Sequence, residues 1–307
     1  MYKRQHEYDA FGPWIDEVVI PDDVPRLYRD HPFDLAGARL VLKVPRSIAR
    51  RDATPDMDLY DHLLVVADDR LTVLSRRLAE QEGQPGAYDA REVPFPEIAA
   101  LRDDVDLLDG RLQVHTRDGQ VVTVRYNGSS REKVELLVDE LRTLAVHADG
   151  ATGGGTGGPG PGLPPADLGR DDVAVFNAYR EVARRRPGLT ALAWHGRSPR
   201  QPLPGALRRL SHLLSPAALQ AAVLAGDAGT LEVFGRRDWL VRGRRPVHSL
   251  SRLVLPRRSL DRVEAHPHPV YADTTTLTLV AGAARPAITV PAGSAVEQLL
   301  AQAAREG

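Results

Sequence analysis

Two kinds of apolar spacing alternate along the chain. Five segments rich in apolar residues predict strands: residues 38–44, 63–67, 70–76, 111–116 and 120–126. In the last two, Leu112 and Val114, and Val122 and Val124, alternate with polar neighbours, so each strand is expected to have one buried face. The turn Arg117-Asp118-Gly119 separates the last two segments, and Asp-Gly is typical of a β-hairpin. The polar pair Asp68-Asp69 predicts a second hairpin between 63–67 and 70–76.

The spacing changes after residue 128. Apolar residues then recur every three or four positions, at Val134, Leu137, Val138, Leu141 and Leu144. This stripe predicts an amphipathic helix. Ser129 and Glu132 are spaced as a capping box, and Arg131 and Glu135 are spaced to pair on the solvent side of the helix. The first half therefore reads as antiparallel strands closed by one helix.

The second half repeats this order. Strands are predicted at 229–235, 239–243, 275–281 and 286–290, and a helix at 294–305, with Arg236-Arg237-Asp238 as the first turn. One constant offset relates the halves: Val93, Pro94, Ile98 and Leu101 fall on Leu255, Pro256, Leu260 and Val263. The same offset places Val134, Glu135, Leu137, Val138 and Leu141 on Val296, Glu297, Leu299, Leu300 and Ala303. We infer that one module is built twice.

The remaining segments define the domain organisation. We expect an acidic N-terminal extension at 1–34, a first module at 35–146, a linker at 147–165 and a second module with additional helices at 166–307. The extension is expected to wrap the first module through Trp14 and Ile15. The additional helices are predicted at 166–186 and at 203–224, the latter broken at Pro216. The linker sequence GATGGGTGGPGPGLPP lacks the strand and helix context of a phosphate-binding loop, so it predicts a flexible tether.

Composition narrows the class of protein. The 307 residues are 42% hydrophobic and 26% charged, which is typical of a globular protein large enough for two domains. There is no cysteine, so disulfides and thiolate metal sites are excluded. The first ten residues contain no apolar core of a signal peptide, and the longest apolar run, 217–226, is too short to span a membrane. We expect a cytoplasmic protein whose membrane contact, if any, is peripheral.

The charge is unevenly distributed between the halves. Residues 1–150 carry a net charge of −9 and residues 151–307 a net charge of +8. Such halves either attract each other within one molecule or face different partners. Only three basic residues are lysines: Lys3, Lys43 and Lys133. This preference for arginine is best explained by the codon bias of a GC-rich genome.

One long segment resembles a known family. The sequence VPFPEIAALRDDVDLLDGRLQVHTRDGQVVTVRYNGSSREKVELLVDELR is similar to the C-terminal part of bacterial pleckstrin-homology (PH) and GRAM-type domains. The resemblance implies an α+β fold of two PH-like strand-rich barrel modules, each closed by a C-terminal amphipathic helix and joined by a flexible Gly/Pro linker. It is weaker in the second copy, where Pro267, Pro269 and Pro286 interrupt the strands. PH-like modules bind phosphoinositides or proteins, so the resemblance does not define one function.

Lipid-binding members of that family carry a basic loop between their first two strands. The candidate loop of the first module holds Asp68 and Asp69, whereas that of the second holds Arg236 and Arg237. The candidate anion-binding residues are Arg236, Arg237, Arg242, Arg244, Arg245, Arg257 and Arg258. Guanidinium groups suit phosphate and carboxylate because they donate two parallel hydrogen bonds. The alternative is a solvated basic face, or pairing with the acidic first half.

No pattern of residues points to catalysis or metal binding. His266 and His268 form the only close histidine pair, and a metal site needs three or four converging ligands. The aspartates of 102–109 lie beside a predicted turn, where aspartate is favoured for local hydrogen bonds. We expect no metal, no cofactor and no nucleic acid partner, because basic residues are rarely interleaved with aromatic ones.

These observations favour a non-catalytic interaction or adaptor protein that binds an as yet unknown protein partner through sheet edges or grooves. The alternative is peripheral binding of anionic lipid through the basic second module. A third reading is an enzyme without a recognisable motif.

Overall fold

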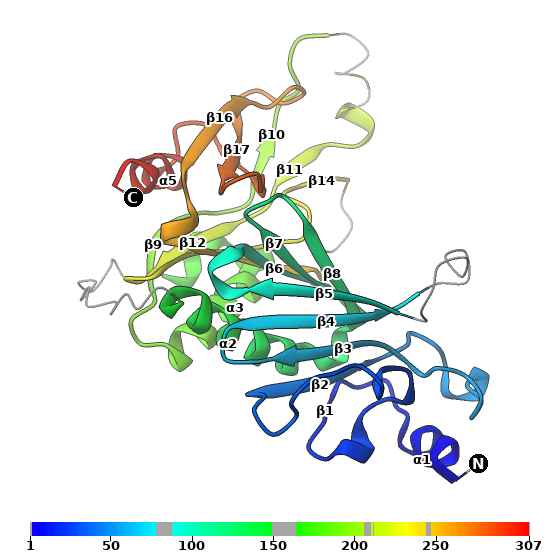
Figure 1. Cartoon of the computed structure of the whole chain (residues 1–307). Helices are drawn as coiled ribbons and strands as arrows, with labels where there is room; N and C mark the ends of the chain where they lie inside the picture. The colour runs from blue at the N-terminus through cyan, green and yellow to red at the C-terminus, as the bar shows by residue number, and fades with distance from the viewer. Residues whose placement is uncertain are drawn as a thin grey trace.

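The computed structural model describes residues 2–77, 88–148, 164–205, 210, 212–243 and 247–306. In these residues the fold is α+β, with four antiparallel sheets and few helices (Figure 1). Part of the predicted linker, residues 149–163, lies outside the described residues.

The first half begins with a five-stranded sheet in chain order. Its strands are β1 (Asp16–Glu17), β2 (Leu40–Pro45), β3 (Tyr60–Val66), β4 (Arg70–Arg76) and β5 (Tyr88–Pro94). One face, with Leu64 and Val73, packs toward the remaining strands of the first half. The other face, with Leu63, packs against the N-terminal extension, whose first helix is α1 (Tyr2–Ala10). Of the two expected anchors, Ile15 is buried, whereas Trp14 is 59% exposed.

A seven-stranded sheet joins the two halves. Its order is β8-β7-β6-β15-β13-β12-β9. The first half supplies β6 (Ile98–Asp106), β7 (Asp109–Thr116) and β8 (Val121–Asn127). The second half supplies β9 (Thr190–His195), β12 (Ala222–Gly226), β13 (Thr230–Gly235) and β15 (Leu250–Pro256). The junction is the antiparallel pair β6–β15, from Val105 opposite Leu250 to Leu101 opposite Val254.

Two three-stranded sheets complete the second half. One contains β10 (Ser198–Arg200), β11 (Ala217–Leu219) and β14 (Leu240–Arg242); the other contains β16 (Arg262–Pro267), β17 (Thr274–Val280) and β18 (Ala287–Pro291). Three longer helices cover the sheets: α2 (Arg131–His147), α3 (Val173–Arg185) and α5 (Ala295–Glu306). Helix α2 packs on β6 and β15, α3 on β12 and β13, and α5 on β9 and β16. The sheet with β16 lies at one end of the molecule and β2 at the other (Figure 1).

Single turns of 3₁₀ helix connect several of these elements. Two of them follow β5 and β15 directly: η5 (Phe95–Glu97) and η9 (Arg257–Ser259). The others in the described residues are Pro21–Asp23, Arg26–Tyr28, Arg50–Asp52, Gly128–Ser130, Pro165–Leu168 and Arg170–Asp172.

The same order of elements occurs in both halves. In each half a first set of strands ends in β5 or β15, a 3₁₀ turn follows, and three antiparallel strands and a helix come next; β15, unlike β5, also pairs with β6 and so lies inside a sheet. The constant offset that carries Val93 onto Leu255 also carries both ends of β5 onto those of β15, and both ends of η5 onto those of η9. The two sequences and the two sets of elements therefore align in the same way.

The two predicted hairpins of the first half are confirmed. β3 and β4 pair across Asp68-Asp69, and β7 and β8 pair across residues 117–119. The closed barrels are not seen: among the described strands, β5 pairs only with β4, and β8 only with β7. The α+β class therefore holds, and the sheets remain open.

Two local predictions are wrong and a third holds only in part. In the segment 203–224, the described residues 210 and 212–214 before Pro216 are helical, as predicted, but the part after Pro216 forms strands β11 and β12. A short apolar run that is largely buried has no period to mark it as a strand. The turn at Arg236 does not join a hairpin, since β13 pairs with β12 and β15. Ser129 does not cap α2; its backbone N–H donates to the side chain of Asn127 instead.

Candidate binding cleft and the buried charges between the halves

The predicted arginine set does not converge on one surface in the described residues. Arg236 is 3% exposed, and its Nε lies 3.0 Å from Asp172 Oδ1. Arg237 reaches the first half, where its Nη1 lies 2.6 Å from Asp109 Oδ2. Both guanidinium groups are therefore held by carboxylates of the same molecule.

Three further arginines of the set bond to separate elements. Arg242 Nε donates to Tyr271 Oη over 2.8 Å, and Arg257 Nε donates to the Asp227 carbonyl over 2.8 Å. Arg258 Nη2 donates to the carbonyl of Ala145 in α2. Arg244 and Arg245 lie outside the described residues. The sequence offers no sign of these contacts, because every acceptor is distant along the chain.

A cluster of buried charges lies where the halves meet. Its centre is Glu232 of β13, which is completely buried and contacts three arginines. Glu232 accepts hydrogen bonds from Arg252 Nε at 2.9 Å, Arg142 Nε at 3.0 Å and Arg186 Nη2 at 2.6 Å. Arg142 comes from α2 of the first half, so the cluster joins the two halves through side chains as well as backbone.

A second carboxylate, Asp139 of α2, extends this cluster. Asp139 lies 2.7 Å from Arg252 Nη2 and 3.1 Å from Arg185 Nε. Acidic groups of the first half thus meet arginines of the second in a buried interface. An ion pair in such a place is costly to break, since either partner left alone is a buried, uncompensated charge.

The pKa values of the cluster reflect a balance of burial and attraction. Burial alone would raise the pKa of Glu232, but Arg252, Arg186 and Arg142 outweigh it and hold that pKa below its usual value. Burial, with the neighbouring Arg186, lowers the pKa of Arg142 to about 10. At neutral pH the carboxylate and the guanidinium groups are therefore all charged.

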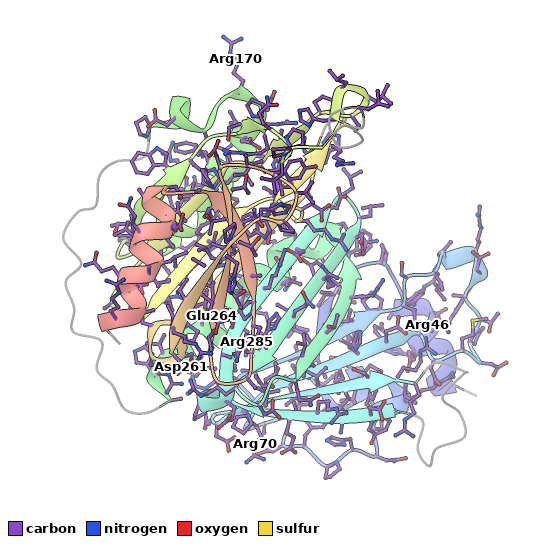
Figure 2. The ribbon with its side chains drawn as sticks, turned by 90° about the horizontal axis from the view of Figure 1, so that it is seen from above. Arg46, Arg70, Arg170, Asp261, Glu264 and Arg285 are labelled. Atoms are coloured by element: carbon purple, nitrogen blue, oxygen red, sulfur yellow. The ribbon has the colours of Figure 1, made fainter. Side chains whose placement is uncertain are left out.

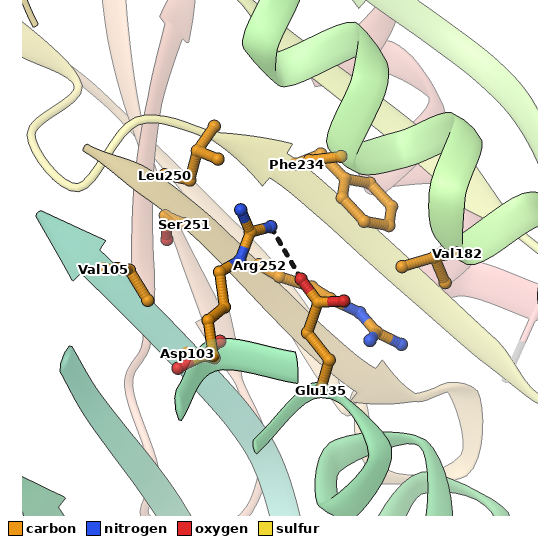
Figure 3. A pocket seen from close by; sticks show the side chains of 10 residues that line it. Asp103, Val105, Glu135, Val182, Phe234, Leu250, Ser251 and Arg252 are labelled. Atoms are coloured by element: carbon orange, nitrogen blue, oxygen red, sulfur yellow. Dashed lines mark ion pairs between the residues drawn. The ribbon is translucent and has the colours of Figure 1, made fainter. Parts of the chain in front are cut away.

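A small cavity adjoins the cluster on the same face of the sheet (Figure 3). Its volume of about 10 Å³ matches a single water molecule. Asp103 of β6 lines it and lies opposite Arg252 in the β6–β15 register. Burial raises the pKa of Asp103 to about 7, although the Tyr126 hydroxyl donates to it over 2.6 Å.

The predicted pair Arg131–Glu135 lines the same cavity. The pair forms at 2.7 Å, shown as the dashed line in Figure 3. It does not lie on the solvent side, because Glu135 is buried and also meets Arg185 at 3.2 Å. The helical spacing predicted the pair correctly and its environment wrongly.

The first half contains a much larger cleft, of about 730 Å³. The lining comes from the N-terminal extension, the β2–β3 connection, the start of β7 and the end of β8. It consists of Phe11, Gly12, Pro13, Pro45, Arg46, Ser47, Ile48, Ala49, Arg50, Asp61, Leu108, Asp109, Arg125, Tyr126 and Asn127. Arg46, labelled in Figure 2, extends from the β2–β3 connection.

The charges of the cleft do not cancel. Asp61 is paired with Arg76 at 2.8 Å and Asp109 with Arg237 at 2.6 Å, and neither of these arginines lines the cleft. The three arginines of the lining, at 46, 50 and 125, therefore supply a net positive charge.

Two of these arginines are held in place by the chain. Arg50 Nη1 donates to the Phe11 carbonyl, and its guanidinium lies 4.4 Å from the centre of the Tyr8 ring. Arg46 Nη1 donates to the Asp58 carbonyl over 3.2 Å. Guanidinium groups fixed in this way lose less freedom when they bind an anion.

The cleft was missed in the sequence because its residues come from four segments that lie far apart along the chain. One signal was present: RSIARR, residues 46–51, places three arginines directly after a predicted strand. That connection, and not the Asp68-Asp69 hairpin, joins β2 to β3.

No family model matches the chain, and no curated protein matches its sequence. Within the described ranges, no group of three or more His, Cys, Asp or Glu residues is placed to hold a metal ion. No helix among the described residues is long and apolar enough to cross a membrane.

Proposed function

We propose that this protein is a non-catalytic interaction protein made of two PH-like modules held as one unit, and that the first module's cleft binds an acidic, partly apolar segment of a partner protein. The PH-like reading is supported by the order of elements in each half, which ends in three antiparallel strands and a helix as the resemblance implies.

The uncompensated arginines of the cleft carry this proposal. Arg46, Arg50 and Arg125 offer donors that suit carboxylates, while both aspartates of the lining are already paired. Ile48 and the 66% exposed Leu108 add apolar surface. A volume of about 730 Å³ lies within the range of roughly 300–1,000 Å³ of ligand pockets, enough for a few side chains of a peptide.

The test is selection from a displayed library of random peptides on the full chain. We expect enrichment of peptides that combine Asp or Glu with apolar residues. The double variant Arg46→Glu/Arg125→Glu should weaken their binding at least tenfold, because two donors become repulsive charges. Arg170→Glu is the matched control, since Arg170 is exposed and projects away from the cleft (Figure 2). Equal binding by the double variant would exclude the cleft as the site.

A second candidate function is attachment to anionic membrane through the second half. Leu210, Leu213 and Leu214 are 57%, 79% and 82% exposed, within the basic sequence LRRLSHLL. Exposed leucines beside arginines are typical of helices that lie on a membrane surface. Flotation with anionic and with neutral liposomes tests this: binding should need the anionic lipid, fall with salt and be lost in Leu213→Ser/Leu214→Ser. Absence of flotation at low salt would exclude it.

A further inference from the structure

The two halves leave one pair of strand edges unused. β6 and β16 are each the first of the three strands that precede a helix, and β5 and β15 are each the last strand before that set in their own half. Only β6 and β15 pair with each other. Among the described strands, β5 pairs only with β4 and β16 only with β17, so each presents an open edge.

The register of the existing junction transfers to these edges. The offset that relates the two halves maps β15 onto β5 and β6 onto β16. The observed pairs Leu253–Arg102, Arg252–Asp103 and Ser251–Asp104 then become Arg91–Glu264, Ala90–Ala265 and Asp89–His266. The first of these positions places opposite charges face to face, which stabilises a sheet, and the third places a carboxylate opposite an imidazole. Within one chain, Glu264 pairs with Arg262 at 2.7 Å and Asp89 with Arg77 at 2.6 Å, so the new pairs would share these carboxylates.

We propose that β5 of one chain pairs in antiparallel fashion with β16 of a second copy of this chain, with Arg91 opposite Glu264. The pairing would extend the five-stranded sheet of one chain by the three strands β16–β18 of the other. It repeats between chains the contact that β6 and β15 make within one. This surface is separate from the cleft of the proposed function.

Both edges are accessible to a partner. Ala90, Arg91 and Glu92 are exposed, as are Ala265 and His266. The covering helix does not prevent pairing, because α5 packs on β16 as α2 packs on β6, which pairs normally.

The prolines that flank these edges fit the same arrangement. Pro94 ends β5 as Pro256 ends the paired strand β15. Pro267 is the last residue of β16, where a missing N–H shortens the ladder without interrupting it.

The intermolecular junction lacks the buried charges of the internal one. At the same offset, Asp139 and Arg142 of α2 correspond to Ala301 and Ala304 of α5. We therefore expect a reversible association that depends on concentration. Because the contact is head-to-tail, each chain keeps a second open edge, and association yields closed dimers or longer chains.

Sedimentation velocity over a range of concentrations tests the proposal with charge-reversed variants. The weight-average mass of the wild type should rise with concentration. Arg91→Glu alone and Glu264→Arg alone should each weaken self-association at least tenfold, because like charges then face each other. An equimolar mixture of the two variants should restore it, since both junctions between unlike variants again place a carboxylate opposite a guanidinium group. Restoration by mixing cannot come from misfolding of either variant.

A cysteine pair gives an independent readout, as the chain has no cysteine. Mild oxidation of Ala90→Cys mixed with Ala265→Cys should give a disulfide-linked dimer. Ala90→Cys mixed with Ala295→Cys, an exposed position outside β16, should not. A constant monomer mass at all concentrations, a mixture that stays monomeric, or cross-linking equal to the control would each overturn the proposal. Pairing of β5 with unrelated extended peptides but not with this chain would overturn it too.

Discussion

The edges of β6 and β16 have the same place in the two halves but different surroundings. β6 is paired with β15, and the Glu232 cluster lies beside the pair with arginines from α2, β15 and the end of α3. β16 is open and largely exposed, and the helix over it offers alanines where α2 has Asp139 and Arg142. Every strand edge has backbone groups to pair. The buried side-chain charges are what distinguish the edge that is permanently paired from the one that is not.

The largest effect is expected from Glu232→Gln. It leaves Arg142, Arg186 and Arg252 buried with their central carboxylate removed, which costs roughly 3–5 kcal/mol in comparable sites. Urea denaturation at pH 7 measures the free energy of unfolding. Glu264→Gln in β16 is the matched control and should change it by less than about 0.5 kcal/mol. Equal effects at the two positions would remove the distinction between the edges.

The same variant has a predicted pH dependence. The pKa of Glu232 is lower in the folded chain than in the unfolded chain. Its stabilising effect is therefore present above the ordinary carboxyl pKa and is lost as the pH falls through the folded value. The difference in the free energy of unfolding between wild type and Glu232→Gln should become smaller in acid. A difference that stays constant down to pH 2 would contradict this.

Asp103→Asn, beside the same junction, should show a pH dependence of stability opposite to that of Glu232→Gln. Since the folded pKa is about 7 and the ordinary value is 3.8, the unfolded chain ionises first as the pH rises. The wild type then loses stability between about pH 4 and pH 7, by an amount on the order of 2–4 kcal/mol. Asparagine keeps an acceptor for the Tyr126 hydroxyl and does not ionise. The stability of the variant relative to the wild type should therefore increase over that pH interval. Thermal unfolding from pH 4 to pH 9 measures this, and parallel curves would refute the assignment.

Gly110→Ala tests packing against Tyr126, whose ring lines the cleft and whose hydroxyl donates to Asp103 at the junction. A Cβ at this position would collide with the ring of Tyr126, so we expect a loss of roughly 1–3 kcal/mol. Gly188→Ala is the control, because no heavy atom lies within 4 Å of the added Cβ. Chemical denaturation of both variants measures the difference.

The smallest effect is expected from Arg237→Ala. This residue also links the halves, through its 2.6 Å ion pair with the half-exposed Asp109. Solvent screening limits such pairs to about 0.2–1 kcal/mol. The contrast with Glu232→Gln separates buried from exposed charge pairs across one interface. A loss of more than about 3 kcal/mol in the free energy of unfolding is the size expected of a buried pair. Such a loss would show that the exposure of an ion pair does not decide how much it stabilises the fold.

The local features of the fold could be predicted from the sequence. Apolar segments and the turn residues between them predicted β3–β4 and β7–β8, the apolar stripe predicted α2, and the offset between the halves matched the bounds of β5 and β15. These features depend on neighbours along the chain, and sequence patterns record such neighbours directly.

Contacts between residues far apart in the sequence could not be predicted. Arg142 and Glu232 look like ordinary surface charges, because only the folded chain brings them together. The pairing of β6 with β15 leaves no pattern either, since a strand that faces solvent on one edge and a strand that pairs there have the same alternation. For the same reason the cleft, with Arg46 and Arg125 far apart in sequence, was found only in the structure.

Hydrogen exchange in dilute solution tests the central distinction between the edges most directly. Peptides covering residues 100–105 and 250–254 should be protected nearly to the level of global unfolding, whereas those covering 88–93 and 262–267 should exchange faster, because half of their amides face an open edge. Exchange of 100–105 and 250–254 as fast as 262–267 would show that the halves are not joined by β6 and β15, and would contradict the account.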